Sequence, residues 1–144
     1  DKLFFINKYY KPELPLNLTK YLFKFANSSI DVSDGLIDDL AKMINRQSLS
    51  FHLFENKIPV SNVLSNFIKK QRLNKINLIS NGDDYQVLFT ADIKKARIIQ
   101  KASKTTGIKI TKIGKIVSGK DRSLIFNEKG KQIQAKSKGY IHQF

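Results

Sequence analysis

Cysteine is absent from this chain of 144 residues, and histidine occurs only twice, as His52 and His142. The absence of cysteine excludes a disulfide framework, thiolate metal ligands and a cysteine nucleophile. Two histidines are too few for a histidine-rich zinc site. No apolar run approaches the length of a membrane span, and no signal-peptide pattern opens the chain. We therefore expect a soluble, cytoplasmic protein with no membrane partner.

Acidic side chains are also scarce, since 12 Asp and Glu stand against 26 Lys and Arg and give a formal net charge of +14. Residues 91–144 carry 14 basic and 3 acidic side chains, whereas residues 1–90 carry 12 and 9. A basic half suits phosphate-bearing partners, either nucleotides or nucleic acid. The lysines are scattered at helix and strand spacing and are not clustered with aromatic residues. We interpret most of them as solvated faces and do not expect a nucleic-acid partner.

The apolar pattern predicts a single α+β domain over residues 1–144, a mixed β-sheet covered by helices. The hydrophobic fraction of 41% and ten Phe supply one core, and the chain is too short for two ordinary domains. Residues 3–10 fit either a strand or the end of a helix. Helices are expected at about 17–26, 34–46, 61–68 and 93–104. Strands are expected at 29–32, 48–54, 76–80, 85–89, 108–116, 123–126 and 131–134, with residues 81–84 as a turn between two of them.

Four of the few carboxylates lie in one stretch, at Asp31, Asp34, Asp38 and Asp39. Ser33 is placed to cap the following helix, and Asp34 then falls in the first turn. One interpretation is a capped helix with a solvated acidic face. The other is a hard-cation site in which Asp31 and Asp34 converge on Mg²⁺, which prefers one or two carboxylates plus phosphate oxygens. Asp38 and Asp39 lie further into the helix and fit the solvated face better.

A second acidic pair, Asp83 and Asp84, follows Asn81 and Gly82 in the turn before an apolar strand. By itself this stretch is more typical of a hairpin turn than of a site. Two acidic clusters at strand ends inside a basic domain, however, favour a metal-bridged phosphate site.

These segments resemble thiamine-monophosphate kinases. Residues 31–36, followed by Asp39 and Leu40, resemble that family's Asp-Ile-Ser-Asp-Gly-Leu…Asp-Leu motif. Residues 82–89 resemble its Gly-Glu-Asp-Tyr-Glu-Leu-Leu-Phe motif, with Asp83 at the position of the glutamate. Three further segments match in the same order, at residues 58–61, 113–116 and 139–142.

The resemblance implies the C-terminal domain of an enzyme of the aminoimidazole-ribonucleotide-synthetase-like superfamily. The N-terminal domain, which holds most of the ATP and metal sites and forms a homodimer, would be absent from this chain. The family transfers the γ-phosphoryl group of ATP to thiamine monophosphate with Mg²⁺ and gives thiamine diphosphate. We therefore expect a transferase of thiamine biosynthesis that is inactive as this chain alone.

The resemblance also assigns roles by position. Asp31 and Asp34 would bind Mg²⁺, and Ser33 would contact the ATP phosphates. Asp83 would hold the thiamine substrate, and Tyr140 would pack on it. No side chain of this chain is expected to act as a nucleophile, because phosphoryl transfer needs positioning and charge neutralisation.

Two alternatives stay open. A sibling enzyme of the same superfamily would use another phosphate acceptor on the same scaffold. A non-catalytic basic module would bind RNA or DNA with a steep salt dependence, and its binding would not change in D31A or D34A.

Overall fold

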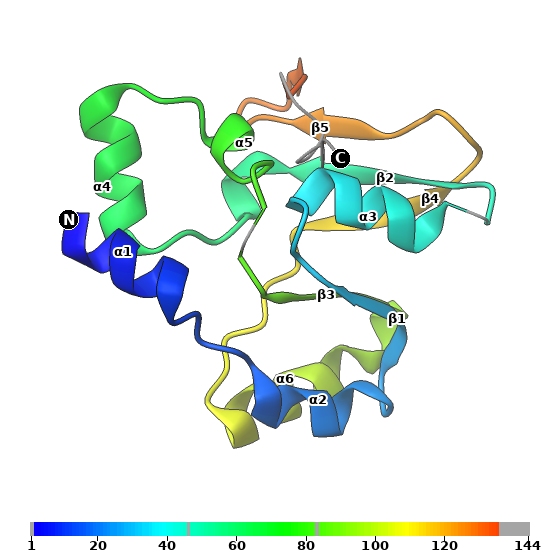
Figure 1. Ribbon diagram of the computed structural model, residues 1–144. Helices are drawn as coiled ribbons and strands as arrows, with labels where there is room; N and C mark the ends of the chain where they lie inside the picture. Colours follow the sequence, from blue (N-terminus) through cyan, green and yellow to red (C-terminus); the bar gives the residue numbers. More distant parts are fainter. Residues whose placement is uncertain (1, 46, 83, 136–144) are drawn as a thin grey trace, which may run out of the picture.

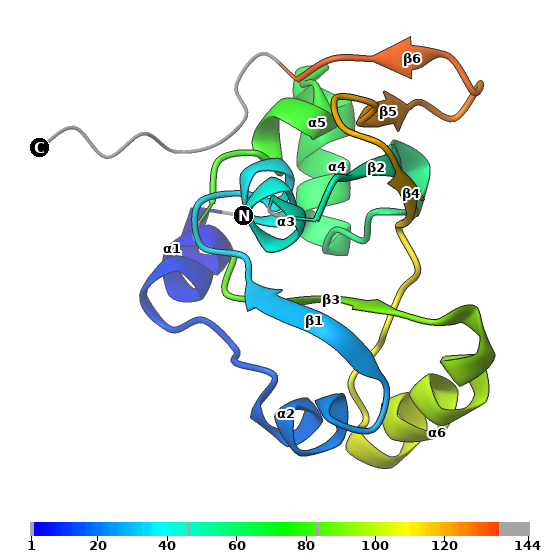
Figure 2. The ribbon, with the colours of Figure 1, turned by 90° about the vertical axis from the view of Figure 1, so that its right-hand side faces the viewer.

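The protein contains two small β-sheets with helices packed around them (Figures 1 and 2). The computed structural model describes residues 2–45, 47–82 and 84–135. The helices are α1 (Lys2–Tyr10), α2 (Leu16–Leu22), α3 (Leu36–Ile44), α4 (Asn62–Gln71), α5 (Lys75–Leu78) and α6 (Ala96–Thr106), with 3₁₀ turns η1 (Glu55–Lys57) and η2 (Ile93–Lys95). The strands are β1 (Ala26–Asp31), β2 (Leu49–Phe54), β3 (Val87–Ala91), β4 (Gly114–Ser118), β5 (Leu124–Phe126) and β6 (Gln132–Ile133).

The larger sheet has the strand order β4-β2-β5-β6. Strand β2 is antiparallel to β4 and parallel to β5, and β5 is antiparallel to β6. This confirms the predicted mixed sheet, in which the strands expected at 123–126 and 131–134 are the antiparallel neighbours β5 and β6. The smaller sheet is the antiparallel pair β1–β3, in which Asp31 lies opposite Val87.

The main core lies between α3 and β2. Helix α3 is amphipathic and buries Leu36, Ile37, Leu40 and Ile44 against Phe51 and Leu53 of β2. This face follows the 3.6-residue period that the sequence showed. A second, smaller core joins α2 to α6 through Leu18, Phe25 and Ala102. Both ribbon views place these two helices side by side, across the β1–β3 pair from the larger sheet.

Several predicted elements are wrong or misplaced. Residues 76–80 are not a strand, because Lys75–Leu78 forms α5 and the Asn74 side chain accepts a hydrogen bond from the backbone N–H of Ile76. The predicted pairing of residues 76–80 with the following strand is therefore wrong, and β3 pairs with β1 instead. The predicted helix at 17–26 ends at Leu22, and the predicted strand at 108–116 is regular only from Gly114.

Other expectations are confirmed. Of the two alternatives for residues 3–10, the structure shows the helix. The helix expected at 61–68 is α4, and its N-cap residue Ser61 accepts a hydrogen bond from the Leu64 backbone N–H. The predicted basic helix at 93–104 corresponds to η2 and α6. Among the residues described, no helix is long and apolar enough to span a lipid bilayer.

Candidate functional site

The two acidic segments lie against each other, backbone to backbone. The N–H of Val32 donates to the Gln86 carbonyl over 2.9 Å, and the N–H of Tyr85 donates to the Val32 carbonyl over 2.8 Å. Gly82 has φ of +82°, and a Cβ built on it would stand 2.3 Å from the Ser33 carbonyl oxygen. Only glycine combines this conformation with so close an approach. Segments some fifty residues apart in the chain thus form one junction.

The loop before α3 is organised by Asp39 and not by Ser33. Gly35 is the N-cap residue, with no side-chain capping bond, so the predicted Ser33 cap is wrong and Asp34 precedes the helix. Asp39 Oδ2 instead accepts the backbone N–H groups of Ser33 (2.9 Å), Asp34 (2.9 Å) and Gly35 (3.2 Å). These amides precede the helix or begin it, where N–H groups have no intrahelical partner and negative charge is favoured.

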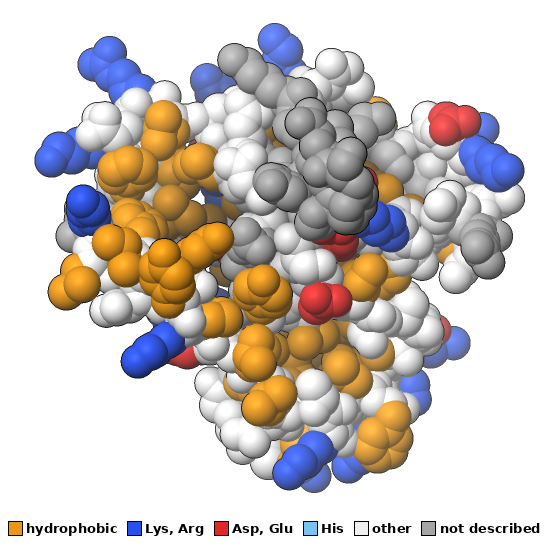
Figure 3. All heavy atoms as spheres, viewed as in Figure 1, with side chains coloured by type: hydrophobic (Ala, Val, Ile, Leu, Met, Phe, Trp, Pro, Cys, Tyr) orange, Lys and Arg blue, Asp and Glu red, His pale blue; other side chains and the backbone are white. Residues whose placement is uncertain are grey.

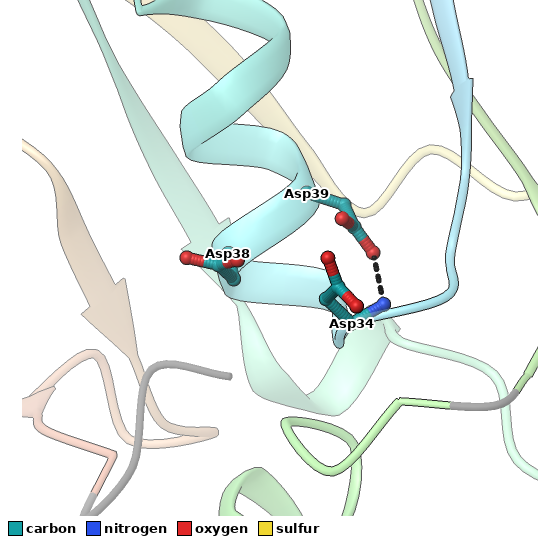
Figure 4. Close-up of side chains that lie close together, drawn as sticks. All are labelled: Asp34, Asp38 and Asp39. Carbon is teal, nitrogen blue, oxygen red and sulfur yellow. Dashed lines mark hydrogen bonds between the residues drawn. The ribbon is translucent and has the colours of Figure 1, made fainter. Parts of the chain in front are cut away.

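Asp39 is 1% exposed, so its expected place on a solvated face is wrong. It forms a group with Asp34 and Asp38, each of which contributes a carboxylate oxygen, and these oxygens lie within 4.8 Å of one another. Asp34 and Asp38 are half-buried. Figure 4 shows the Asp39 carboxylate facing the loop at Asp34, with Asp38 on the first turn of α3. We call these three side chains the carboxylate cluster.

Lys42, one turn further along α3, supplies the cation of the carboxylate cluster. Its Nζ donates to Asp34 Oδ2 and lies 2.6 Å from Asp38 Oδ2 and 3.4 Å from Asp39 Oδ1. The hydrogen bonds to Asp34 and then Asp38 raise the pKa of Lys42 above its usual range. Sequence reasoning missed this residue, although the Asp38–Lys42 spacing of four on a helix is a recognised ion-pair pattern.

The donor set of the carboxylate cluster fits a hard divalent cation. Its ligands are all carboxylate oxygens, and the Lys42 ammonium shows that positive charge is accommodated among them. Mg²⁺ prefers such oxygens together with water or phosphate. Asp39 Oδ2 already accepts hydrogen bonds from three backbone amides, so Oδ1 is the Asp39 oxygen that could bind a divalent cation.

Asp31 and Ser33, the other predicted site residues that the structure describes, are not members of the carboxylate cluster. Asp31 ends β1, is exposed and lies outside the carboxylate cluster. Ser33 is half-buried beside Asp34, with its N–H on Asp39. Asp83 and Tyr140, the predicted substrate-binding residues, lie outside the described residues.

A wide groove begins at the junction of the two segments. It extends far from the junction: Gly82, Asp84 and Gln86 line it together with side chains of α1, α2, β3, α6 and residues 107–116, and its volume is about 1940 Å³. Figure 3 shows hydrophobic side chains gathered over α1 and α4, on the left of the molecule. Pockets for small ligands usually enclose roughly 300–1,000 Å³. The groove is therefore too large to be a pocket for one small ligand.

Comparison with known proteins shows consistent similarities, although no family model matches the chain. Thiamine-monophosphate kinase of Buchnera aphidicola subsp. Schizaphis graminum is 35% identical over 141 residues, which are 96% of this chain and 42% of the relative. The Escherichia coli K12 thiamine-monophosphate kinase is 28% identical over 99% of this chain and 43% of its own length. The chain thus spans well under half the length of these curated relatives.

Solved structures agree. The structure of AaThiL complexed with AMPPCP and TMP matches 98% of this chain and 41% of its own, with a TM-score of 0.75 and 28% identity. The thiamine-monophosphate kinase from Stenotrophomonas maltophilia K279a matches 85% of this chain and 37% of its own, with a TM-score of 0.68 and 25% identity. These matches confirm the predicted aminoimidazole-ribonucleotide-synthetase-like α+β fold.

Proposed function

We propose that this chain, a relative of the thiamine-monophosphate kinases along 96% of its length, is the C-terminal domain of such an enzyme. The complete enzyme would transfer the γ-phosphoryl group of ATP to thiamine monophosphate and release thiamine diphosphate and ADP. The observation that carries the proposal is the junction of the two motif segments, at which Gly82 lies against the backbone of Ser33 and of Asp34, a member of the carboxylate cluster.

The chemistry of the reaction explains the residue types at this junction. Joining two anionic phosphates requires cations between them, and Mg²⁺ would supply that charge neutralisation. Asp34, Asp38 and Asp39 Oδ1 would hold the cation, and Asp31 would add a ligand from the end of β1. Ser33 would contact the ATP phosphates from the loop that Asp39 organises.

The resemblance also suggests which residues would bind the acceptor. Asp83 and Tyr140 are the residues that we propose for thiamine monophosphate, the first by accepting hydrogen bonds and the second by stacking on a flat or cationic ring. We also propose an N-terminal domain and a homodimeric complete enzyme, as the resemblance implies. We propose a cytoplasmic setting as well.

The test uses the complete polypeptide of which this chain would be the C-terminal domain. Incubation with ATP, Mg²⁺ and thiamine monophosphate should give thiamine diphosphate, and D31A and D34A should each abolish it while the protein stays folded. Turnover that survives D34A would refute the metal assignment. A folded, ATP-binding protein that gives no thiamine diphosphate would refute the acceptor, and other phosphorylated acceptors would then be compared.

A further inference from the structure

We infer that the Lys42 ammonium is the resident cation of the carboxylate cluster and that it leaves the cluster when a divalent cation binds. The inference rests on the proposed function, because the proposed kinase reaction is what requires a divalent cation at this site. Lys42 is neither a ligand of the divalent cation nor part of the two motifs. Its role would be to compete with that cation for the carboxylate cluster.

The contacts of Lys42 place its charge at the point where the three carboxylates face one another. Nζ reaches Asp34 Oδ2, Asp38 Oδ2 and Asp39 Oδ1. These are the same carboxylates that would serve a metal ion. An ammonium and a divalent cation therefore cannot both be held there at full contact, since like charges at such a distance repel strongly.

The differing burial of these side chains shows which part can move. The Asp39 side chain is 2% exposed and is fixed by three backbone amides, whereas the Lys42 side chain is 45% exposed. Lys42 can swing its flexible stem into solvent without opening the core. Asp39 and the loop at residues 33–35 would stay in place, so the exchange changes one side chain and leaves the site preformed.

The charges in the carboxylate cluster determine how Lys42 affects the binding of a divalent cation. Three carboxylates within 4.8 Å carry three negative charges, and Lys42 neutralises one of them while no metal is present. The ammonium thus holds the carboxylates together in the metal-free state. The same ammonium weakens the binding of a bare divalent cation, which must displace it.

The exchange is tested by titrating Mg²⁺ into the 144-residue chain by calorimetry, without ATP or thiamine monophosphate. K42Q should bind Mg²⁺ about tenfold more tightly than wild type, because it lacks a unit charge close to the cation. K42R keeps the charge and should stay near the wild-type affinity. K20Q removes an exposed lysine of α2 and is the matched control for net charge.

A second readout follows Lys42 directly. In lysine-labelled wild-type protein, the Lys42 ammonium should give an NMR signal protected from solvent exchange, and Mg²⁺ should abolish that protection. Equal affinity in K42Q and K20Q, no Mg²⁺ binding by either, or protection that persists with bound Mg²⁺ would each overturn the inference. The kinase assay is independent of this titration, so thiamine diphosphate formation by the complete polypeptide would leave the proposed function standing.

Discussion

Gly35 lies so close to Ser80 that a Cβ on the glycine would stand 2.4 Å from the Ser80 carbonyl oxygen. Gly35 also has φ of +124°, which side chains other than that of glycine rarely adopt. Nearby, the Leu36 backbone N–H donates to the Ile79 carbonyl over 3.2 Å. The start of α3 and the end of α5 are thus fixed to each other at a position that accepts only glycine.

We predict that G35A destabilises the chain by about 3 kcal/mol, because backbone strain is joined by a clash with backbone atoms that cannot rotate away. Urea denaturation followed by circular dichroism measures the loss. G107A is the matched control, since Gly107 has φ of +71° but a Cβ added there would meet no atom within 4 Å. It should cost only about 1–2 kcal/mol. Equal losses in the two variants would contradict the close approach.

Asp39 should be worth far more to the fold than its neighbour Asp38. D39A removes the acceptor for three backbone N–H groups and should destabilise by about 3 kcal/mol or more, because hydrogen bonds to a charged group contribute about 1.5–3 kcal/mol each and buried amides would lose their partner. D38A removes a half-buried ion pair to Lys42 and should cost about 1 kcal/mol or less. Urea denaturation of both variants measures the two losses in free energy of unfolding. A larger loss in D38A than in D39A would contradict the prediction.

Ser50 of β2 is a second buried polar residue whose hydrogen bonds should contribute to stability. It is 1% exposed; its hydroxyl donates to the Gly119 carbonyl over 2.6 Å and accepts the Arg122 N–H over 3.0 Å. S50A should therefore cost about 2 kcal/mol, because the Gly119 carbonyl and the Arg122 N–H, which form part-buried hydrogen bonds with the Ser50 hydroxyl, each lose a partner. S118A, at an exposed serine of the adjacent strand β4, should stay within about 0.5 kcal/mol of wild type in thermal unfolding. A neutral S50A would argue against these bonds.

The sequence predicted what local periodicity governs. The helices expected at 34–46 and 61–68 follow from apolar spacing within one element, and the structure confirms both as α3 and α4. Residues 76–80 were misassigned because a short apolar run fits a strand and a buried helical turn equally well. The capping of Asn74 onto Ile76 favoured the helix.

The carboxylate cluster was only partly predictable for a related reason. Asp34 was identified as a candidate ligand, but Asp39 was assigned to a solvated face. Its backward reach to the amides of residues 33–35 depends on Gly35 beginning the helix two residues later than Ser33 would have done. The β1–β3 pairing, which joins the two acidic segments, is non-local and leaves no signal in either segment alone.

Lys75 provides a pH-dependent prediction away from the carboxylate cluster. Its Nζ donates to the carbonyls of Glu55 and Ile58 over 2.8 and 2.6 Å and so joins α5 to the η1 turn. Burial lowers the pKa of Lys75 from its ordinary value of 10.5, against a smaller opposing effect of Glu55. The folded state therefore releases this proton at a lower pH than the unfolded state does.

The sign of the effect follows from that order of pKa values. Below the folded pKa the charged, desolvated ammonium carries its full penalty, and the penalty is relieved as the pH rises toward 10.5. The stability of wild type relative to K75M should thus increase as the pH rises toward 10.5, measured as the difference in free energy of unfolding in urea at each pH. K70M, at an exposed lysine of α4, controls for the loss of one positive charge. The prediction fails if the stability of wild type relative to K75M decreases as the pH rises. It also fails if the stability of wild type relative to K70M changes with pH in the same way, because Lys75 would then not be specially desolvated.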